Sequence, residues 1–420
     1  MSQTANPAAS PAPLPATRFS WQTPIIILIC GCLIGVLGFG PRSGLGFFLK
    51  PMSTEFGWGR DVLSLALAIQ MLLWGAAQPF AGALSDRFGP VPVLSVGAIL
   101  YGLGLAGMSY SSSPALLHLM AGGVVGLGLA MASFTLVIGA FGKLMPPEWR
   151  TLSFGLGTAA GSFGQFLFSP LSVALIGAVG WHQTLIVYGF VVLAIIPLSF
   201  ALAMPKRVAA AANAPVQQTA GQAMTEALGH RSYVLLTLGF FTCGFQIFFV
   251  SVHLPAYLVD RGLPIEVGGW AIATIGLFNI IGAITAGYFA GKMPKRYILS
   301  FIYFGRAVAI AIYIMLPPST TVTLVFGAVL GLLWLSTVPP TSGLVAVMFG
   351  TRWLATLFGF AFFSHQVGGF LGVYLGGYLF EKTGSYDIVW WLSIALGVIS
   401  ALLNLPIVEK PVARLAPQPA

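Results

Sequence analysis

Arg42 stands inside the first long apolar run of the chain, well before the polar residues that end it. A charged side chain in hydrocarbon costs about 2.5–3.5 kcal/mol on insertion scales, so it normally faces a bundle interior or a water-filled cavity. Gly31, Gly35, Gly38, Arg42 and Gly46 recur at steps of three and four, on one helix face. We expect Arg42 to bind an anion. The alternative is that the glycines only admit a neighbouring helix while Arg42 reaches the outer interface.

Two histidines lie in later apolar runs. Gln246, His253 and Tyr257 fall at steps of seven and four and form a polar stripe, either substrate-binding or hydrogen-bonded at the outer interface. His365 shares its helix face with Gly369. Histidine titrates near neutral pH, so His365 is the candidate proton carrier, with a bridging core histidine as the alternative.

A second intramembrane cation, Arg306, lies about ten residues into its run and near mid-membrane. It is expected to be either a second anion anchor or a structural brace. Gln366, Asn279 and Trp334 complete the expected substrate-binding set, and weaker candidates are Gln70, Trp74 and Gln78.

All ten acidic residues lie in loops or at the ends of apolar runs: Glu55, Asp61, Asp86, Glu148, Glu226, Asp260, Glu266, Glu381, Asp387 and Glu409. Exporters of cationic drugs and carboxylate-based proton carriers need a buried acid. The intramembrane charge here is positive, which suits an anionic substrate.

The composition excludes several classes of protein. Of the 420 residues, 57% are hydrophobic and only 7% are charged, so lipid must surround most of the chain. The net charge of +9 is spread singly over short loops and predicts no nucleic-acid partner. Cys30, Cys32 and Cys243 lie in apolar runs and form neither a disulfide framework nor a metal site. No nucleophile–base pair stands out, so we expect neither an enzyme nor a cofactor.

Twelve runs are long enough to cross a bilayer, six on each side of a polar break. We expect an all-α integral membrane protein of two six-helix bundles, 21–204 and 232–408, joined by a cytoplasmic linker at 205–231. Residues 1–20 and 409–420 are expected to be cytoplasmic tails, the first of them disordered. The runs are 24–49, 61–83, 91–109, 114–142, 151–179, 183–204, 232–258, 266–290, 297–316, 320–348, 353–380 and 386–407.

Lysine and arginine indicate the orientation of these helices. With both termini cytoplasmic, thirteen of them fall on that side and four (Lys50, Arg60, Arg261 and Lys382) on the other. The halves also resemble repeats about 205 residues apart: Gly82–Gly89 matches Gly287–Pro294, and Arg150 matches Arg352. Two such halves around a midplane site are typical of secondary transporters.

The motif Gly82-x-x-x-Asp86-Arg87-x-Gly89, in the first cytoplasmic hairpin, resembles the signature of the major facilitator superfamily over roughly residues 20–408. The resemblance implies that Asp86 and Arg87, with Gly82 and Gly89, form a latch that holds the cytoplasmic gate closed. The second copy has Gly291 in place of the aspartate.

A narrower resemblance is to the monocarboxylate-porter and oxalate/formate-antiporter branches. Phe39-Gly-Pro-Arg-Ser-Gly-Leu-Gly-Phe-Phe-Leu-Lys50 is similar to the segment where monocarboxylate porters place a substrate-binding cation, and the segment from Arg150 to Gly164 resembles their helix-5 signature. Those branches carry an arginine in helix 8, where this chain has Ala283.

The sequence therefore predicts a monomeric secondary transporter of the inner membrane that moves a small organic anion, a mono- or dicarboxylate, by alternating access. Coupling to protons or to a counter-anion is left open. The main rival is an exporter of neutral or weakly acidic drug-like compounds, and a membrane sensor or scaffold of the same fold is a further one.

Overall fold

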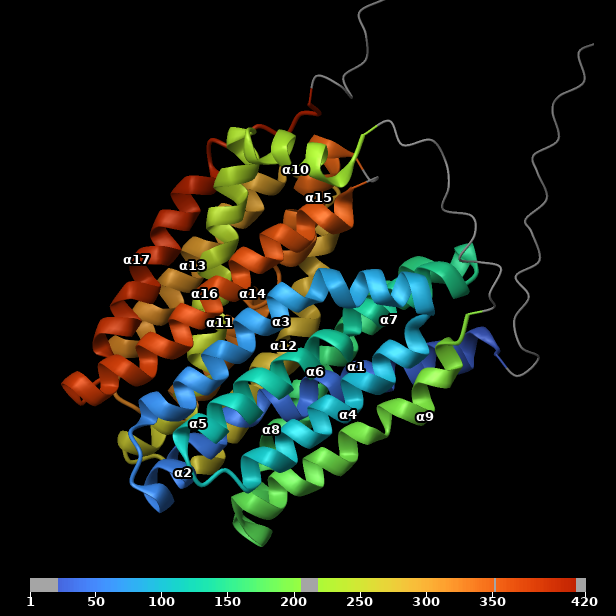
Figure 1. Ribbon diagram of the computed structural model, residues 1–420. Coiled ribbons are helices and arrows are strands. Elements are labelled where there is room, and N and C mark those ends of the chain that lie inside the picture. Colours follow the sequence, from blue (N-terminus) through green and yellow to red (C-terminus); the bar gives the residue numbers. More distant parts are fainter. Residues whose placement is uncertain (1–21, 205–217, 351–352, 413–420) are drawn as a thin grey trace, which may run out of the picture.

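The computed structural model describes residues 22–204, 218–350 and 353–412, and all its regular elements there are helices (Figure 1). The predicted N-terminal tail, residues 413–420 of the predicted C-terminal tail and residues 205–217 of the predicted linker lie outside these residues. Eleven helical stretches are long and apolar enough to cross a membrane. One of them, Ser153–Leu202, holds two crossings separated by Gly180, whose φ of 80° bends the chain. The described chain thus crosses twelve times, six times on each side of the linker, as predicted.

The first half contains α1 to α9. Its elements are α1 (Pro24–Ser43), the 3₁₀ segment η1 (Leu45–Phe48), α2 (Leu49–Phe56), α3 (Arg60–Phe88), α4 (Pro90–Ser109), α5 (Pro114–Leu117), the π-helical segment η2 (His118–Val124), α6 (Val125–Met131), α7 (Phe134–Leu144), α8 (Pro147–Leu193), α9 (Ile195–Ser199) and the 3₁₀ segment η3 (Phe200–Leu202).

The short α10 (Ala220–Leu228) leads into the second half. The elements that follow are α11 (Arg231–Asp260), α12 (Ile265–Ala290), α13 (Lys295–Met315), α14 (Thr320–Leu333), α15 (Val338–Phe349), α16 (Leu354–Thr383) and α17 (Asp387–Asn404).

The fourth and tenth crossings are both broken near mid-span. The fourth breaks between α6 and α7, at Ala132 and Ser133, although no proline lies there. The tenth breaks between α14 and α15, before Pro339 and not at it. Proline is tolerated in the first turn of a helix, so Pro339 starts α15 without interrupting it. Paired breaks at matching positions of two repeats are typical of transporter binding regions.

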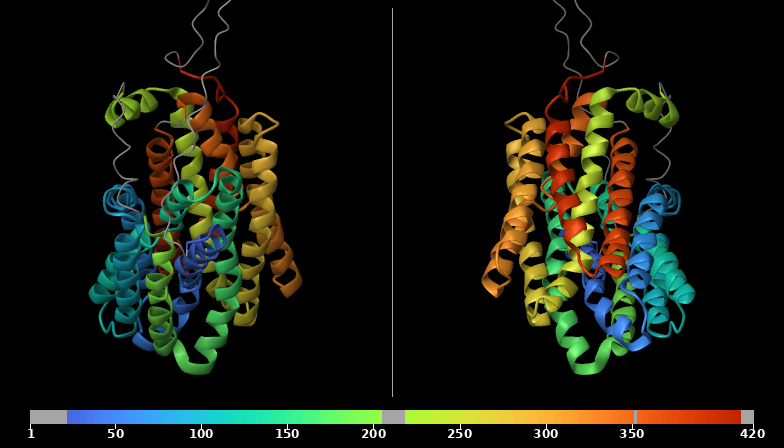
Figure 2. Two further views of the ribbon diagram at one scale, coloured as in Figure 1. Left: turned by 90° about the vertical axis from the view of Figure 1, so that its right-hand side faces the viewer. Right: turned by 90° about the vertical axis from the view of Figure 1, so that its left-hand side faces the viewer.

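The two ends of the molecule differ. At one end, called the linker end here, α10 lies across the tips of the second-half helices (Figure 2). Both described chain termini lie there as well: Gln22 donates to the carbonyls of Ala201 and Ala203, and Val412 N–H donates to Met348. The opposite end, called the far end here, carries α2.

The halves touch at the far end and separate toward the linker end. In the antiparallel α3–α16 pair, Gly377 lies against Ser64. Eleven residues nearer the linker end on each helix, Gly75 lies against Gln366. Seven residues further still, the same register brings Gly82 opposite Gly359, yet a Cβ on either would meet no atom within 4 Å. The structure therefore represents a conformation in which the two halves are packed together at the far end and apart at the linker end.

The α8–α12 pair has the same asymmetry. Gly269 lies against Pro170 and Gly276 lies against the backbone of Ser162, whereas a Cβ on Gly155, nearer the linker end, would meet nothing. Small residues permit this close approach of helix backbones in a membrane. Both inter-half helix pairs thus meet over the same portion of their length.

Candidate functional site

Arg42 lies at the junction of the halves, 7% exposed. Its Nη2 is 2.8 Å from the sulfur of Met71, and its Nε has no hydrogen-bond partner. None of the acidic side chains that the structure describes forms an ion pair with it. A buried cation without a counter-charge is costly, so the site favours an anion from solution.

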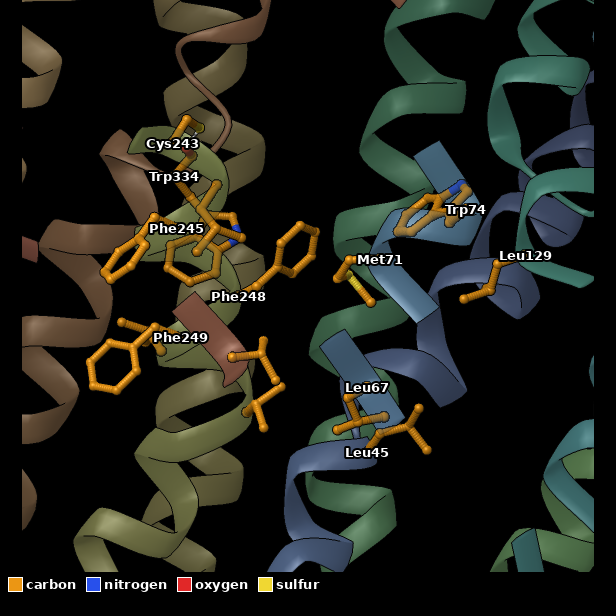
Figure 3. Packing of buried hydrophobic residues seen from close by; sticks show 14 of the residues in the cluster. Leu45, Leu67, Met71, Trp74, Leu129, Cys243, Phe245, Phe248, Phe249 and Trp334 are labelled. Atoms are coloured by element: carbon orange, nitrogen blue, oxygen red, sulfur yellow. Dashed lines mark hydrogen bonds between the residues drawn. The ribbon is translucent and has the colours of Figure 1, made fainter. Parts of the chain in front are cut away.

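Aromatic rings surround the guanidinium group. Its central carbon lies 4.9 Å from the Trp74 ring, 4.5 Å from the Phe248 ring and 5.6 Å from the Phe39 ring. Phe362 packs edge-on against Trp74 at 6.0 Å. Figure 3 shows Phe248 of α11 directed across the junction toward Met71 and Trp74 of α3. We call Phe39, Trp74, Phe248 and Phe362 the aromatic wall. Its rings come from both halves and stabilise the cation by cation–π contact.

The local sequence of α1 explains where Arg42 points. Pro41 lies within the last turn of α1, and the Ser43 hydroxyl donates a hydrogen bond to the Gly40 carbonyl at 2.6 Å. Beyond the end of α1, Gly46 lies against the backbone of Val252 in the second half. The glycines before Arg42 pack against first-half helices: Gly31 faces Phe141 of α7. The small-residue face thus seats α1, and Arg42 points from its end to the junction.

His365 belongs to the same surroundings. Its ring is stacked on Phe362 at 5.5 Å and lies edge-on to Phe248 at 5.4 Å. Its Nδ1 lies 3.4 Å from Gln366 Oε1, and its Nε2 has no partner. Gln366 is fully buried against Gly75, with its amide nitrogen also unpaired. Two predicted site residues, Arg42 and His365, therefore share the aromatic wall, and Gln366 adjoins His365.

Arg306 lies elsewhere, inside the second half. It is fully buried on α13, and its guanidinium donates to the carbonyls of Leu333 (Nε, 2.9 Å) and Trp334, which the break between α14 and α15 leaves free. Unpaired carbonyls at membrane depth must be satisfied internally, and Arg306 does so. Such contacts are those of a structural brace, and the role of Arg306 stays a prediction.

Other predicted site residues hold the second half together around that break. Gln246 donates to the Ser393 carbonyl at 2.8 Å and accepts from Arg306. Asn279 accepts from Leu335 N–H at 2.9 Å and donates to Ser162 Oγ of the first half at 2.8 Å. Trp334 is buried within the break itself.

His253 and Tyr257 lie closer to the far end, among second-half helices. His253 Nε2 is 2.8 Å from the Val373 carbonyl of α16, and its ring packs against Phe249 and Tyr386. Tyr257 packs against Tyr313 and Trp390. The structure does not bring this pair to Arg42.

The predicted cytoplasmic latch lies at the open linker end. The side chain of Asp86 is outside the part that the structure describes. Arg87 is exposed over the Phe88 ring, Gly82 faces open space, and Gly89 ends α3 with a φ of 85° that suits glycine.

A contact that the sequence did not reveal joins the halves at the far end. Arg60, at the start of α3, donates from Nη2 to Asp260 Oδ1 at 2.8 Å and from its backbone N–H to Glu381 at 2.7 Å. It also donates to Tyr386 OH at 3.0 Å and stacks on Phe380. Lys50 reaches Asp260 as well. We call Arg60, Asp260, Glu381 and Tyr386 the far-end latch.

A small cavity of about 10 Å³ adjoins Arg42 between the halves. A cavity of this size has room for about one water molecule. Among the described residues, no group of His, Cys, Asp or Glu is arranged to hold a metal ion.

Comparisons with known proteins agree with this architecture. The chain is 27% identical over 393 residues to an uncharacterised MFS-type transporter of Bacillus subtilis, covering 91% of this chain and 94% of the relative. It is 26% identical to mouse monocarboxylate transporter 11 (90% and 85%) and 23% identical to a probable sulfoacetate transporter of Cupriavidus necator (91% and 94%).

Solved structures share the fold. A D-xylose–proton symporter superposes with a TM-score of 0.67 at 16% identity, over 94% of this chain and 99% of the symporter. A bacterial homologue of the lysosomal transporter Spinster gives 0.71 at 15% identity, over 92% and 97%. The model of the major facilitator superfamily matches residues 31–373. With this match and the two six-helix halves, the chain belongs to the major facilitator superfamily of secondary transporters.

Proposed function

We propose that this transporter moves a small organic anion, a carboxylate or a chemically similar acid, with Arg42 as its binding cation. The observation that carries the proposal is Arg42 itself, buried at the junction of the halves with no acidic partner among the described residues. An arriving anion supplies the missing counter-charge, and bidentate contact with a guanidinium suits a carboxylate.

The surroundings of Arg42 support a substrate with one anionic group. The other intramembrane cation, Arg306, already donates to Leu333, Trp334 and Gln246. The aromatic wall offers apolar contact to the rest of the substrate. Monocarboxylate transporter 11 and the probable sulfoacetate transporter are named for small organic acids, which favours the same class.

Alternating access follows from the asymmetry of the halves. In this state the far-end latch holds the opposite side closed, so the substrate is expected to approach Arg42 from the linker end, past the contact of Trp74 with Phe362. Rocking of the halves would bring Gly82 against Gly359 at the linker end and open the far-end latch. The excess of Lys and Arg at the linker end supports a cytoplasmic position for it, and hence an inner-membrane transporter with both termini inside.

His365 is the proposed proton carrier if transport is proton-coupled. Its unpaired Nε2 and its contact with Phe248, which Arg42 also touches, support this role. Exchange against a counter-anion needs no carrier, because Arg42 can hold either anion in turn.

The test is exchange of labelled acids in proteoliposomes. Wild-type protein should exchange at least one small carboxylate or sulfonate, and Arg42→Gln should abolish exchange while melting as a folded protein. Arg42→Lys should retain only part of the activity, because it keeps the positive charge but loses the bidentate geometry of the guanidinium group. The matched control is Arg231→Gln, which removes an exposed arginine at the start of α11, at the linker end. Wild-type exchange by Arg42→Gln would refute the proposal.

The aromatic wall also favours a second candidate, export of neutral or weakly acidic apolar compounds. That function predicts transport that is insensitive to competing anions and to the charge at residue 42. The same assay with a lipophilic amide and its parent acid separates the two.

A further inference from the structure

The small cavity beside Arg42 has an unusual set of hydrogen-bonding groups. Its polar lining residues are Arg42, Ser43, Gln70 and Ser251. Both serine hydroxyl hydrogens are engaged, Ser43 with the Gly40 carbonyl and Ser251 with the Ile247 carbonyl. The serines can therefore only accept from a ligand. Apart from the guanidinium group, the cavity offers acceptors.

Gln70 supplies the strongest of these acceptors. Its amide nitrogen lies 2.9 Å from the Ala121 carbonyl, and a carbonyl oxygen can only accept. This contact fixes the orientation of the amide, so the atom left over is the carbonyl oxygen Oε1. Gln70 is fully buried, and Oε1 has no hydrogen-bond partner.

The partner of Gln70 adds to the case for a fixed side chain. Ala121 lies in the π-helical segment η2. Such segments are rare in proteins, and those that occur are often found at functional sites. Because Ala121 holds the nitrogen of Gln70, the amide cannot turn to satisfy Oε1 elsewhere. Buried polar atoms without a partner are rare, and each calls for an explanation. A cavity of this size can hold one water molecule that would donate to Oε1, and a donor on a bound ligand would satisfy the same atom.

We propose that Gln70 determines substrate specificity: its Oε1 accepts a hydrogen bond from a neutral donor, such as a hydroxyl, on an acid whose carboxylate is bound by Arg42. The inference rests on the proposed function of Arg42. A carboxylate alone would face the acceptor oxygens of Gln70, Ser43 and Ser251, whereas a hydroxylated acid presents oxygen to Arg42 and hydrogen to Gln70. An ammonium donor is disfavoured, because Arg42 already leaves the site with unbalanced positive charge.

The rival explanation is that Gln70 only braces η2 through Ala121. A brace would change the affinity for every acid by the same factor. A substrate contact changes the ratio between a hydroxylated acid and its counterpart without the hydroxyl. The ratio of the two affinities is therefore the decisive quantity.

The experiment measures equilibrium binding to the full-length protein in lipid nanodiscs by calorimetry. The probes are two matched pairs: mandelate with phenylacetate, and 2-hydroxypropanoate with propanoate. Wild type should prefer the hydroxylated member of each pair about tenfold, the worth of one buried hydrogen bond. Gln70→Met, similar in length but without the amide, should bring the ratio close to one.

Gln78→Met is the matched control. Gln78 lies two turns further along α3, and both ends of its amide are already paired, with Trp74 and with Ser133. This variant should weaken both members of a pair equally and leave the ratio at its wild-type value. Melting temperatures check that each variant is folded. If Gln70→Met does not fold, the ratio of the two affinities measured on the wild type still tests the proposal.

Each result decides between the two proposals. Equal wild-type affinity within each pair overturns the role of Gln70 while leaving anion transport intact, as does a preference that survives in Gln70→Met. If none of the four acids binds, and no acid is exchanged in proteoliposomes, the proposed function fails and the role of Gln70 fails with it.

Discussion

Arg60 and Asp260 join the two halves of the transporter, with Nη2 of the arginine 2.8 Å from Oδ1 of the aspartate. They are 200 residues apart, and one begins α3 while the other ends α11. Arg60 is also held by Glu381, through its backbone N–H, and by Tyr386, so a single residue meets three second-half partners. Opening the far end must break these contacts together.

Arg60→Gln should therefore shift the transporter away from the state described. The Asp260 side chain is 27% exposed, so solvent screens part of the interaction, and we expect a shift of about 1–2 kcal/mol, roughly five- to thirtyfold in the population ratio. Distances between spin labels at Thr54 and Glu266, in a protein with its three cysteines replaced, would lengthen at the far end.

Arg261→Gln is the control for this shift. It removes an arginine of the same end whose ring contact, with Tyr257, stays within the second half. Its label distances should match wild type. An unchanged distance distribution in Arg60→Gln would mean that the helix packing alone keeps the far end closed.

Gly359→Leu should trap the protein in the present state. Gly359 faces open space here but lies in register with Gly82, onto which it must close when the linker end shuts. Added bulk then costs nothing in this state and obstructs the other. Binding of an acid should persist while exchange across the membrane is lost. Gly221→Leu, in α10 and also unopposed, should exchange normally; full exchange by Gly359→Leu would refute the register.

Arg42 and Arg306, the two arginines inside apolar runs, should respond oppositely to replacement. Arg306→Gln leaves the carbonyls of Leu333 and Trp334 without donors, which should cost about 1–3 kcal/mol for each group left unpaired and lower the melting temperature. Arg42→Gln removes an unbalanced buried charge and should raise or preserve the melting temperature while abolishing anion binding. Thermal melts in detergent, beside binding assays, test both; a stable Arg306→Gln would contradict the bracing role.

The sequence allowed the twelve crossings and the two halves to be predicted, because each span must carry its own apolar residues. It also singled out Arg42, because a charge in an apolar run is visible without a structure. The aromatic wall could not be predicted: Phe248 and Phe362 are two of 32 phenylalanines, most of them equally suited to face lipid. The Arg60–Asp260 pair was hidden for a different reason, since both residues look like ordinary helix-end charges.

The breaks in the fourth and tenth crossings show the same limit. The tenth crossing is broken just before Pro339 and Pro340, where Arg306 and Asn279 take up the freed backbone groups. Nothing in the sequence near Ser133 marks the matching break. These features depend on partners from other helices, which local sequence patterns do not contain.

His365 is the residue on which proton coupling, if present, should depend. Among the described residues, no carboxylate forms an ion pair with Arg42, and His365 shares Phe248 with Arg42. Binding a proton together with an anion leaves the loaded site at its resting charge, which limits the cost of carrying the substrate through a low-dielectric region.

His365→Gln keeps hydrogen-bonding capacity but cannot titrate. It should retain exchange of labelled acid at equal pH and lose uptake driven by a pH gradient. His253→Gln, a fully buried histidine away from the aromatic wall, is the matched control and should retain both. Gradient-driven uptake at the wild-type rate in His365→Gln would exclude it as carrier, leaving entry of the protonated acid or plain anion exchange.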